Sequence, residues 1–343
     1  MTAGNPLLSV RDLHTQFETP DGTVRAVDGV GFEVRTGETV CLVGESGSGK
    51  TVTCDSLAGL VESPGEVTDG EVRLHGEELT VMDEPQLRRV RGRRIGYVFQ
   101  NPQNALDPVY RVGDQVAESI RYHRDVSRAT AEDRAVSLLE QVGIPDAERR
   151  AEDYPHEFSG GMKQRVVVAI ALASDPDLLV ADEPTTALDV TMQASILRLL
   201  DDLQDDRDMG IVFVTHDLGV VAEIADRVVV MYAGEVVERG DVHAVFDQPG
   251  HPYTRALFRC LPGRGERMEP IPGSAPDPTD LPAGCRFRPR CPHAVDECES
   301  APDSQPLARE DHEAACVHYR PDRTPPWEAR ADAEELVRGE GDD

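Results

Sequence analysis

Near its start the chain has two stretches in which apolar and polar residues alternate, at 7–17 and 24–34, on either side of Pro20-Asp21-Gly22. This period of two, broken by a turn sequence, predicts two antiparallel strands. Shorter apolar runs at 39–43, 70–74, 95–99, 177–182 and 211–214 predict further strands, and a strand pair is expected around Ala233-Gly234. The run at 177–182 is typical of a buried parallel strand, so the pattern favours an α/β fold.

The pattern changes to a helical period between about residues 101 and 175. Apolar residues recur with spacings near 3.6 at Val112–His123 and Ala129–Val142, which predicts an inserted helical subdomain. Two further segments, 52–60 and 166–173, are compatible with helices.

The octapeptide Gly44-Glu45-Ser46-Gly47-Ser48-Gly49-Lys50-Thr51 lies between the apolar run 39–43 and a helix-compatible segment. A glycine-rich turn in this context directs backbone N–H groups at one point, where the helix N-terminus adds positive potential. This is a complete P-loop, in which Lys50 would reach the β- and γ-phosphates and Thr51 would ligate Mg²⁺.

Polar side chains follow three of the later apolar runs, where an open α/β sheet places its ligand groups. Asp182 is expected to hold Mg²⁺ through water, and Glu183 to orient the water that attacks the γ-phosphate. His216 can donate to a γ-phosphate oxygen, and Gln100 could reach Mg²⁺ or its water. Their joint order after a P-loop predicts ATP hydrolysis.

Three other positions are candidates for nucleotide contacts. The run Ser159-Gly160-Gly161 precedes a helix and would form a second phosphate-binding element, although alone it would suit an ordinary helix cap. Asp189 closely follows the paired carboxylates. Phe17 could stack on adenine or belong to the core, and the pattern leaves both open.

The composition is strongly acidic. The chain has 35 Lys and Arg against 64 Asp and Glu, a net charge of −29, and its two lysines are Lys50 and Lys163. Such a surface repels nucleic acid phosphates. It resembles the proteins of salt-accumulating halophiles, and we expect a halophilic archaeal source, although GC-rich coding could explain the shortage of lysine. No targeting or membrane-spanning stretch is found, so we expect a cytoplasmic protein.

The order of P-loop, Gln100, Ser159-Gly160-Gly161, Asp182-Glu183, Asp189 and His216 resembles the nucleotide-binding subunit of an ABC transporter over residues 7–245. Residues 43–50 and 154–162, the segment His251-Pro252-Tyr253-Thr254 and the cysteine-bearing C-terminus resemble the D-type ATPase subunit of dipeptide and oligopeptide importers. The family-wide signature Leu-Ser-Gly-Gly-Gln is replaced here by Phe158 to Met162, a variant that this closer subfamily shares.

The resemblance implies a P-loop NTPase core with an antiparallel β subdomain, the helical subdomain and a small cysteine-bearing C-terminal extension. It also implies an ATP- and Mg²⁺-dependent, head-to-tail dimer with a related F-type ATPase subunit. In that dimer the Ser159 segment of one subunit closes over ATP held by the other. Two membrane permease subunits would bind near Gln100 at the cytoplasmic face, and an external solute-binding protein would act indirectly.

Three domains are expected: the nucleotide-binding domain at 1–245, the extension at 246–320 and a charged, partly disordered tail at 321–343. The Pro- and Gly-rich stretch 248–282 is expected to be an ordered extension or linker rather than a second core. In the tail, little besides Trp327 and Leu336 is available for burial.

Four cysteines, Cys285, Cys291, Cys298 and Cys316, have the spacing C-x5-C-x6-C-x17-C. Structural zinc sites typically use short C-x2-4-C pairs, which are absent here, whereas an all-cysteine shell also suits a 4Fe-4S cluster. The resemblance favours the cluster, with zinc and unligated or disulfide-linked thiols as alternatives. Arg286, Arg288 and Arg290 could offset cluster charge. Since this segment is far from Lys50 in sequence, Cys291→Ser is expected to leave ATP binding intact.

Other functions remain open. The same machinery could import nickel or oligosaccharides, because specificity lies in the permeases and the external binding protein. A different class, a soluble ABC-type ATPase acting on ribosomes or DNA, usually carries tandem nucleotide domains or long coiled coils. This chain has one P-loop, no heptad run and no basic patch, which disfavours that class.

Overall fold

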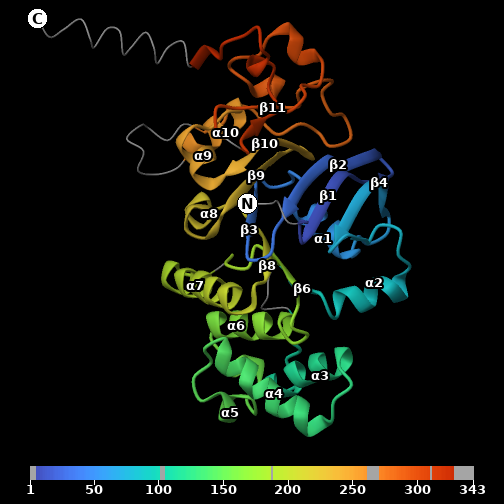
Figure 1. Ribbon diagram of the computed structural model, residues 1–343, viewed down its shortest axis with the longest axis vertical. Coiled ribbons are helices and arrows are strands. Elements are labelled where there is room, and N and C mark those ends of the chain that lie inside the picture. Colours follow the sequence, from blue (N-terminus) through green and yellow to red (C-terminus); the bar gives the residue numbers. More distant parts are fainter. Residues whose placement is uncertain (1–4, 101–104, 187, 261–269, 310, 328–343) are drawn as a thin grey trace, which may run out of the picture.

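The computed structural model describes residues 5–100, 105–186, 188–260, 270–309 and 311–327 of the 343-residue chain. Within them the strands form two sheets. Figure 1 shows the helices of residues 112–171 at one end of the molecule, the C-terminal segment at the other, and the sheets between them. No helix in the described part of the chain is long and apolar enough to cross a bilayer.

The larger sheet lies at the centre of the fold. Its described strands, in sheet order, are β11 (Gln305–Pro306), β12 (Glu313–Ala314), β10 (Glu235–Asp241), β9 (Arg227–Tyr232), β3 (Thr39–Val43), β8 (Gly210–Thr215), β7 (Leu178–Asp182) and β6 (Ile95–Val98). Strands β9 to β6 in this order are parallel, and those beyond β9 pair antiparallel. Because β3, β7 and β8 are buried throughout, their sequences are continuous apolar runs. The carboxyl ends of the parallel strands meet at one edge.

The smaller sheet is antiparallel, as the alternating pattern predicted. Its described strands, in sheet order, are β2 (Gly22–Val34), β1 (Leu8–Thr19), β4 (Gly65–Leu74) and β5 (Glu77–Glu78). Leu8, Leu13 and Val27 are fully buried and pack in one apolar cluster with Leu42 of β3. The small sheet is therefore fixed against the strand that leads into the P-loop.

The helices confirm the predicted change from strand-like to helical spacing of apolar residues between about residues 101 and 175. They are α1 (Lys50–Ala58), α2 (Glu84–Arg91), α3 (Val112–His123), α4 (Arg128–Gln141), α5 (Ala147–Arg150), α6 (Gly160–Ala171), α7 (Val190–Arg207), α8 (Leu218–Ile224), α9 (Val242–Asp247) and α10 (Pro252–Arg259). Helix α3 has the predicted bounds, and α4 is shifted by one residue. Both pack against each other and against α6.

Helix α6 begins six residues earlier than the pattern at 166–173 predicted. Ser159 is its N-cap, and the hydroxyl accepts a hydrogen bond from the Met162 N–H at 3.3 Å. A serine in this position satisfies an N–H group that the helix itself leaves unpaired. The two glycines therefore belong to the first turn of the helix.

The stretch 248–282, expected to be an ordered extension or linker, contains a helix that the sequence pattern did not predict. This helix, α10, begins after the N-cap His251 with a proline at its first position. Tyr253 and Phe258 of this helix are buried and belong to the main core cluster. The spacing of these aromatic residues was obscured by the surrounding prolines and glycines. Residues 261–269 lie outside the described part.

The segment after residue 282 is held by short elements: the 3-10 turns η3 (Arg288–Arg290), η4 (Asp296–Glu299) and η5 (Val317–Tyr319), together with β11 and β12. Because β12 pairs with β10, this segment extends the larger sheet by two strands. In the expected tail, Trp327 Nε1 donates to the Tyr319 hydroxyl at 3.3 Å. Leu336 and the rest of 328–343 lie outside the described residues.

Candidate functional site

The P-loop connects β3 to α1 in the way that its sequence predicts. At two positions of the loop only glycine fits, because the backbone has a positive φ and a neighbouring carbonyl oxygen leaves no room for a Cβ. A Cβ on Gly44 (φ 155°) would lie 2.2 Å from the Met231 carbonyl oxygen, and one on Gly49 (φ 99°) would lie 2.2 Å from that of Ala26. Helix α1 follows at once with Lys50, and Gly49 offers no side chain to cap it. Its first N–H groups can therefore face an anion.

Lys50 is folded back onto the loop. Its Nζ donates to the carbonyl oxygens of Gly44 and Glu45, both at 2.9 Å, and to Ser48 Oγ at 3.3 Å. Burial lowers the pKa of Lys50, although the nearby carboxylates of Glu183 and Asp182 act in the opposite direction. The ammonium group thus lies inside the loop, where phosphate oxygens could replace these carbonyls.

Asp182, the last residue of β7, faces the first turn of α1. The Thr51 hydroxyl donates to Asp182 Oδ1 at 3.3 Å. Burial raises the pKa of Asp182 to about 6. A hydroxyl and a carboxylate from facing elements fit Mg²⁺, which in proteins is typically bound by one or two carboxylates while water and substrate phosphates complete its shell.

Glu183 follows Asp182 in a left-handed conformation with φ 46°, and its N–H donates to the Val214 carbonyl at 3.0 Å. Its carboxylate is contacted by three side chains: Thr186 Oγ1 at 2.8 Å, Gln100 Nε2 at 3.2 Å and His216 Nδ1 at 3.2 Å. Partial burial acts to raise the pKa of Glu183, but these contacts outweigh it and lower the pKa. The carboxylate is therefore ionised and held in one orientation.

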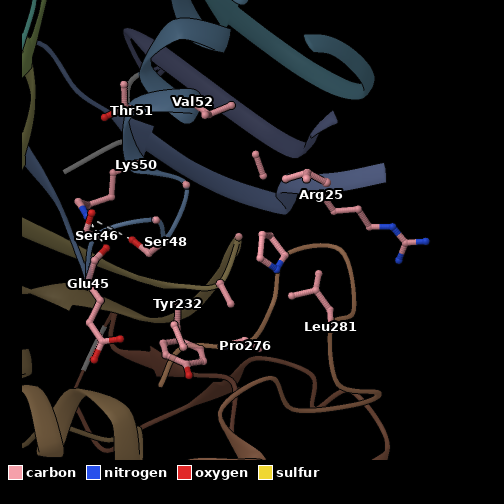
Figure 2. A pocket seen from close by; sticks show the side chains of 18 of the residues that line it. Arg25, Glu45, Ser46, Ser48, Lys50, Thr51, Val52, Tyr232, Pro276 and Leu281 are labelled. Atoms are coloured by element: carbon pink, nitrogen blue, oxygen red, sulfur yellow. Dashed lines mark hydrogen bonds between the residues drawn. The ribbon is translucent and has the colours of Figure 1, made fainter. Parts of the chain in front are cut away.

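A cavity of ≈ 580 Å³ opens beside the P-loop, within the range usual for small-molecule sites. Phe17, Val24 and Gln100 line it together with residues 45–52 and Glu183, and residues 232–234 of the β9–β10 turn complete the wall. Figure 2 shows Lys50, Thr51 and Ser48 on one side, with Pro276 and Leu281 on a loop nearby. The cavity thus joins the predicted phosphate end to the predicted base end at Phe17.

Some predicted residues do not line this cavity. Ser159, Gly160 and Gly161 lie at the start of α6 and are absent from its wall. Asp189 is the N-cap of α7, where its carboxylate accepts from the Met192 N–H at 2.9 Å. Ala187 lies outside the described residues.

Sequence reasoning missed the contribution of the C-terminal segment to this site. Ala275, Pro276, Pro278 and Leu281 line the cavity. The Tyr253 hydroxyl accepts a hydrogen bond from the Glu45 N–H at 2.8 Å. The His251-Pro252-Tyr253-Thr254 segment had been noticed as a resemblance, but nothing local in the sequence connects it to the P-loop.

The four clustered cysteines line one small cavity and have no disulfide partner. Burial raises the pKa values of Cys285, Cys291 and Cys316, the last two to about 11 and about 12. Among the described residues, no group of three or more His, Cys, Asp or Glu side chains could hold a metal ion. The four thiols converge, as their spacing predicted, without forming a metal site.

The three arginines considered for offsetting cluster charge form ion pairs within the protein. Each is paired with a carboxylate: Arg286 with Asp28 and Glu235, Arg288 with Glu299, and Arg290 with Glu45. The Arg290 pair brings the cysteine segment, which is far from Lys50 in sequence, into contact with the P-loop, since Arg290 immediately precedes Cys291.

Two family models match the chain. The model described as "ABC transporter" matches residues 27–186, and the one described as "Oligopeptide/dipeptide transporter, C-terminal region" matches residues 237–298.

Curated relatives match nearly the whole chain. A putative peptide import ATP-binding protein of Brucella ovis is 49% identical over 92% of this chain and 98% of its own length. The oligopeptide transport ATP-binding protein AppD of Bacillus subtilis is 48% identical over 85% of this chain and 90% of its own length. The dipeptide transport ATP-binding protein DppD of Escherichia coli is 45% identical over 91% of this chain and 96% of its own length.

Among solved structures, the dimeric ABC transporter cassette MJ0796 has a TM-score of 0.62 and 28% identity, covering 68% of this chain and 98% of that one. A post-hydrolysis dimer of the same cassette, bound to ADP and Pi, has a TM-score of 0.61 with 28% identity and the same coverage. The part of this chain beyond that coverage corresponds to about a third of its length.

Proposed function

Since the chain belongs to the ATP-binding proteins of oligopeptide and dipeptide ABC transporters, we propose that the cavity beside its P-loop is where ATP is bound and hydrolysed to drive peptide import. The chain is the ATP-binding subunit of such an importer, and it works with membrane permeases as a dimer. The arrangement of Glu183, held by three side chains at the edge of the cavity, carries the chemical assignment.

We assign the reaction as follows. Lys50 exchanges its loop carbonyls for the β- and γ-phosphate oxygens, and the P-loop N–H groups bind the same phosphates. Thr51, Asp182 and Gln100 would hold Mg²⁺, which supplies charge neutralisation at the phosphates. Glu183 orients the attacking water and accepts its hydrogen bond, while His216 donates to the γ-phosphate. Phe17 stacks on the base.

Ser159, Gly160 and Gly161 act on the ATP of a second subunit. This assignment is supported by the exposed position of Ser159 at the N-terminus of α6. They begin α6, whose N-terminus would face the γ-phosphate across a head-to-tail dimer, and Asp189 lies at the same interface. The second subunit is a related F-type ATPase rather than a second copy. Mixing the two purified subunits with ATP should give a heterodimer by light scattering, whereas each alone should remain smaller.

Two permease subunits bind near Gln100, which places the chain peripherally at the cytoplasmic face of the membrane, and an external solute-binding protein delivers the solute. The net charge of −29 disfavours nucleic acid as a partner. The solute is tested by reconstituting the ATPase pair with permeases and binding protein in vesicles. ATP-dependent uptake of di- and oligopeptides is expected. Uptake of nickel or an oligosaccharide instead would overturn the peptide assignment.

For the four cysteines we propose a 4Fe-4S centre with a structural role. The support is the convergence of four thiols on one cavity, a ligand set that suits such a cluster. Zinc is disfavoured by the cysteine spacing, which lacks the short C-x2-4-C pairs typical of structural zinc sites. Anaerobic purification with an absorbance spectrum and iron, sulfide and zinc analysis tests this. Colourless, iron-free protein would overturn it.

A further inference from the structure

Glu45 is a P-loop residue that is fixed by contacts from the described part of the C-terminal segment at both its backbone and its side chain. Its N–H donates to the Tyr253 hydroxyl at 2.8 Å. Its carboxylate accepts two hydrogen bonds from Arg290, Nη1 to Oε2 at 2.8 Å and Nη2 to Oε1 at 3.1 Å. A forked arginine–carboxylate pair of this kind fixes orientation as well as charge.

Both contacting residues are themselves held firmly. Tyr253 is fully buried and packs against the rings of Tyr232 and Phe287. The Arg290 side chain is 7% exposed, its Nε donates to the Pro272 carbonyl at 2.9 Å, and its Nη1 donates to the Tyr232 hydroxyl at 3.1 Å. Neither group needs to be ordered when a ligand arrives, so little conformational entropy is lost on binding.

We propose that Tyr253 and Arg290 are positioning residues for ATP binding, which hold the P-loop through Glu45 in the conformation that accepts phosphate. This inference rests on the proposed function of the cavity. The loop on either side of Glu45 contains Gly44 and Gly47, both in left-handed geometry, so it has little stiffness of its own. The extension supplies the stiffness from outside the loop.

Arg290 has a second effect, on charge. A free Glu45 carboxylate beside the loop would repel the triphosphate in a partly desolvated cavity. Pairing with Arg290 cancels that repulsion while the carboxylate keeps the loop in place. Tyr253 acts without charge, because its hydroxyl satisfies the Glu45 N–H and so fixes the direction in which that peptide unit points.

The test measures the affinity of the purified full-length chain for ATP by titration calorimetry. Arg290→Gln should weaken ATP binding about tenfold, the usual effect of losing hydrogen bonds to a charged group. Arg288→Gln is the matched control. It removes the same charge two residues before Arg290, from a side chain whose Nη1 lies 2.7 Å from Glu299 Oε1 rather than near the P-loop. The control should bind ATP within about twofold of wild type. Arg290→Lys should restore only part of the loss, because an ammonium lacks the fork.

Two further variants separate positioning from charge. Tyr253→Phe keeps the buried ring and removes the hydroxyl, and we expect it to weaken ATP binding about fivefold. Glu45→Gln removes both the repulsion between the Glu45 carboxylate and the triphosphate and the ion pair with Arg290. The double variant Glu45→Gln/Arg290→Gln should therefore bind ATP more tightly than Arg290→Gln alone, a non-additive result typical of contacting residues.

A purely structural role would lower the melting temperatures of Arg290→Gln and Tyr253→Phe without changing the ATP affinity of the folded protein. That result, with both variants binding ATP as tightly as Arg288→Gln, would overturn the inference. If Arg290→Gln does not fold, Tyr253→Phe decides by the same criterion. Wild-type protein that binds no ATP would instead refute the proposed function itself.

Discussion

At the scale of single residues, the geometry of the site depends on two side chains, Glu183 and Lys50, that are each held by several hydrogen-bond partners. Glu183 combines a left-handed backbone with three side-chain partners, and Lys50 donates to three oxygens of its own loop. Backbone conformations of this kind cost free energy and persist where surrounding contacts determine them. Their combination beside one cavity is what a hydrolytic site for a phosphoanhydride requires.

Glu183→Gln should keep ATP binding and lose turnover, since the amide retains the size of the side chain but orients water poorly. Lys50→Ala should lose both, because the phosphate oxygens lose their cation. Binding is measured by calorimetry and turnover by phosphate release from the assembled ATPase pair. Glu223→Gln, at an exposed position on α8, is the control. Equal turnover in wild type and Glu183→Gln would remove Glu183 from this role.

Leu281→Ala should weaken the binding of ATP without weakening the binding of inorganic tripolyphosphate. Leu281 lines the cavity with Phe17 and lies on a loop of the C-terminal extension. Losing about three methylene-sized groups of apolar contact corresponds to roughly a three- to tenfold loss of ATP affinity. Competition of each compound against a fluorescent nucleotide measures the difference. An equal loss for both compounds would mean that Leu281 supports the phosphate end.

At the scale of elements, a buried carboxylate adds to the strand pairing that attaches the C-terminal segment to the sheet. Glu238 of β10 accepts from the N–H groups of Gly250 and His251, both at 2.7 Å, and lies 2.8 Å from His312 Nε2. The Glu238 and His312 side chains are almost fully buried. The three groups come from β10, the start of α10 and the β11–β12 connection, so this contact joins the elements that bring Tyr253 to the P-loop.

Glu238→Gln should lower the free energy of unfolding by about 3 kcal/mol, because one backbone N–H then faces an amide N–H₂ in a buried site. Thermal unfolding of the full chain checks the loss, and limited proteolysis should cut first after residue 248. Glu118→Gln on the exposed side of α3 is the control. A melting temperature equal to that of the control would show that the buried carboxylate is dispensable.

Cys291→Ser should release any iron and also weaken ATP binding, against the expectation from sequence separation. Cys291 follows η3, its N–H donates to the Arg288 carbonyl at 3.2 Å, and the neighbouring Arg290 binds Glu45. We expect about a threefold loss of ATP affinity, smaller than for Arg290→Gln because the fork itself remains. Cys260→Ser, outside the cluster, is the control. Unchanged affinity after loss of iron would separate the two sites.

At the scale of the whole molecule, charge is the dominant feature. Sixty-four acidic against 35 basic side chains leave a net charge of −29 on one chain. Arginines such as Arg73, Arg94 and Arg239 are already engaged in ion pairs. The excess carboxylates therefore lack a basic partner and repel one another. We propose that this composition is an adaptation to high salt.

The fold should therefore unfold more easily at low KCl, because the Debye length grows from about 3 Å at 1 M to about 10 Å at 0.1 M and the repulsion is no longer screened. Thermal melts between about 0.1 M and several molar KCl measure this, with a choline chloride series as a control for specific ion binding. A melting temperature that does not change across the series would argue against salt adaptation.

The amino-acid pattern was enough to predict the longer strands of both sheets, the helices α3 and α4 and the P-loop, since each is specified by a local period or a contiguous motif. It did not predict the two-residue strands β5, β11 and β12. It also predicted that Gln100, Asp182, Glu183 and His216 lie at one edge of the sheet, because parallel strands bring their carboxyl ends together there. Gln100 and His216 do contact Glu183, and Asp182 contacts Thr51, while their roles in hydrolysis stay a prediction. Four cysteines within 32 residues were expected to converge, and they do.

The relation of the C-terminal segment to the site became visible only in the folded chain. Tyr253 and Arg290 are 208 and 245 residues from Glu45, and no local period or motif records a contact across such a distance. Helix α10 escaped prediction because its signal is short and lies among prolines and glycines, and its burial depends on a core built by distant strands. The pairing of the three arginines likewise depends on which carboxylates the folded chain brings within reach.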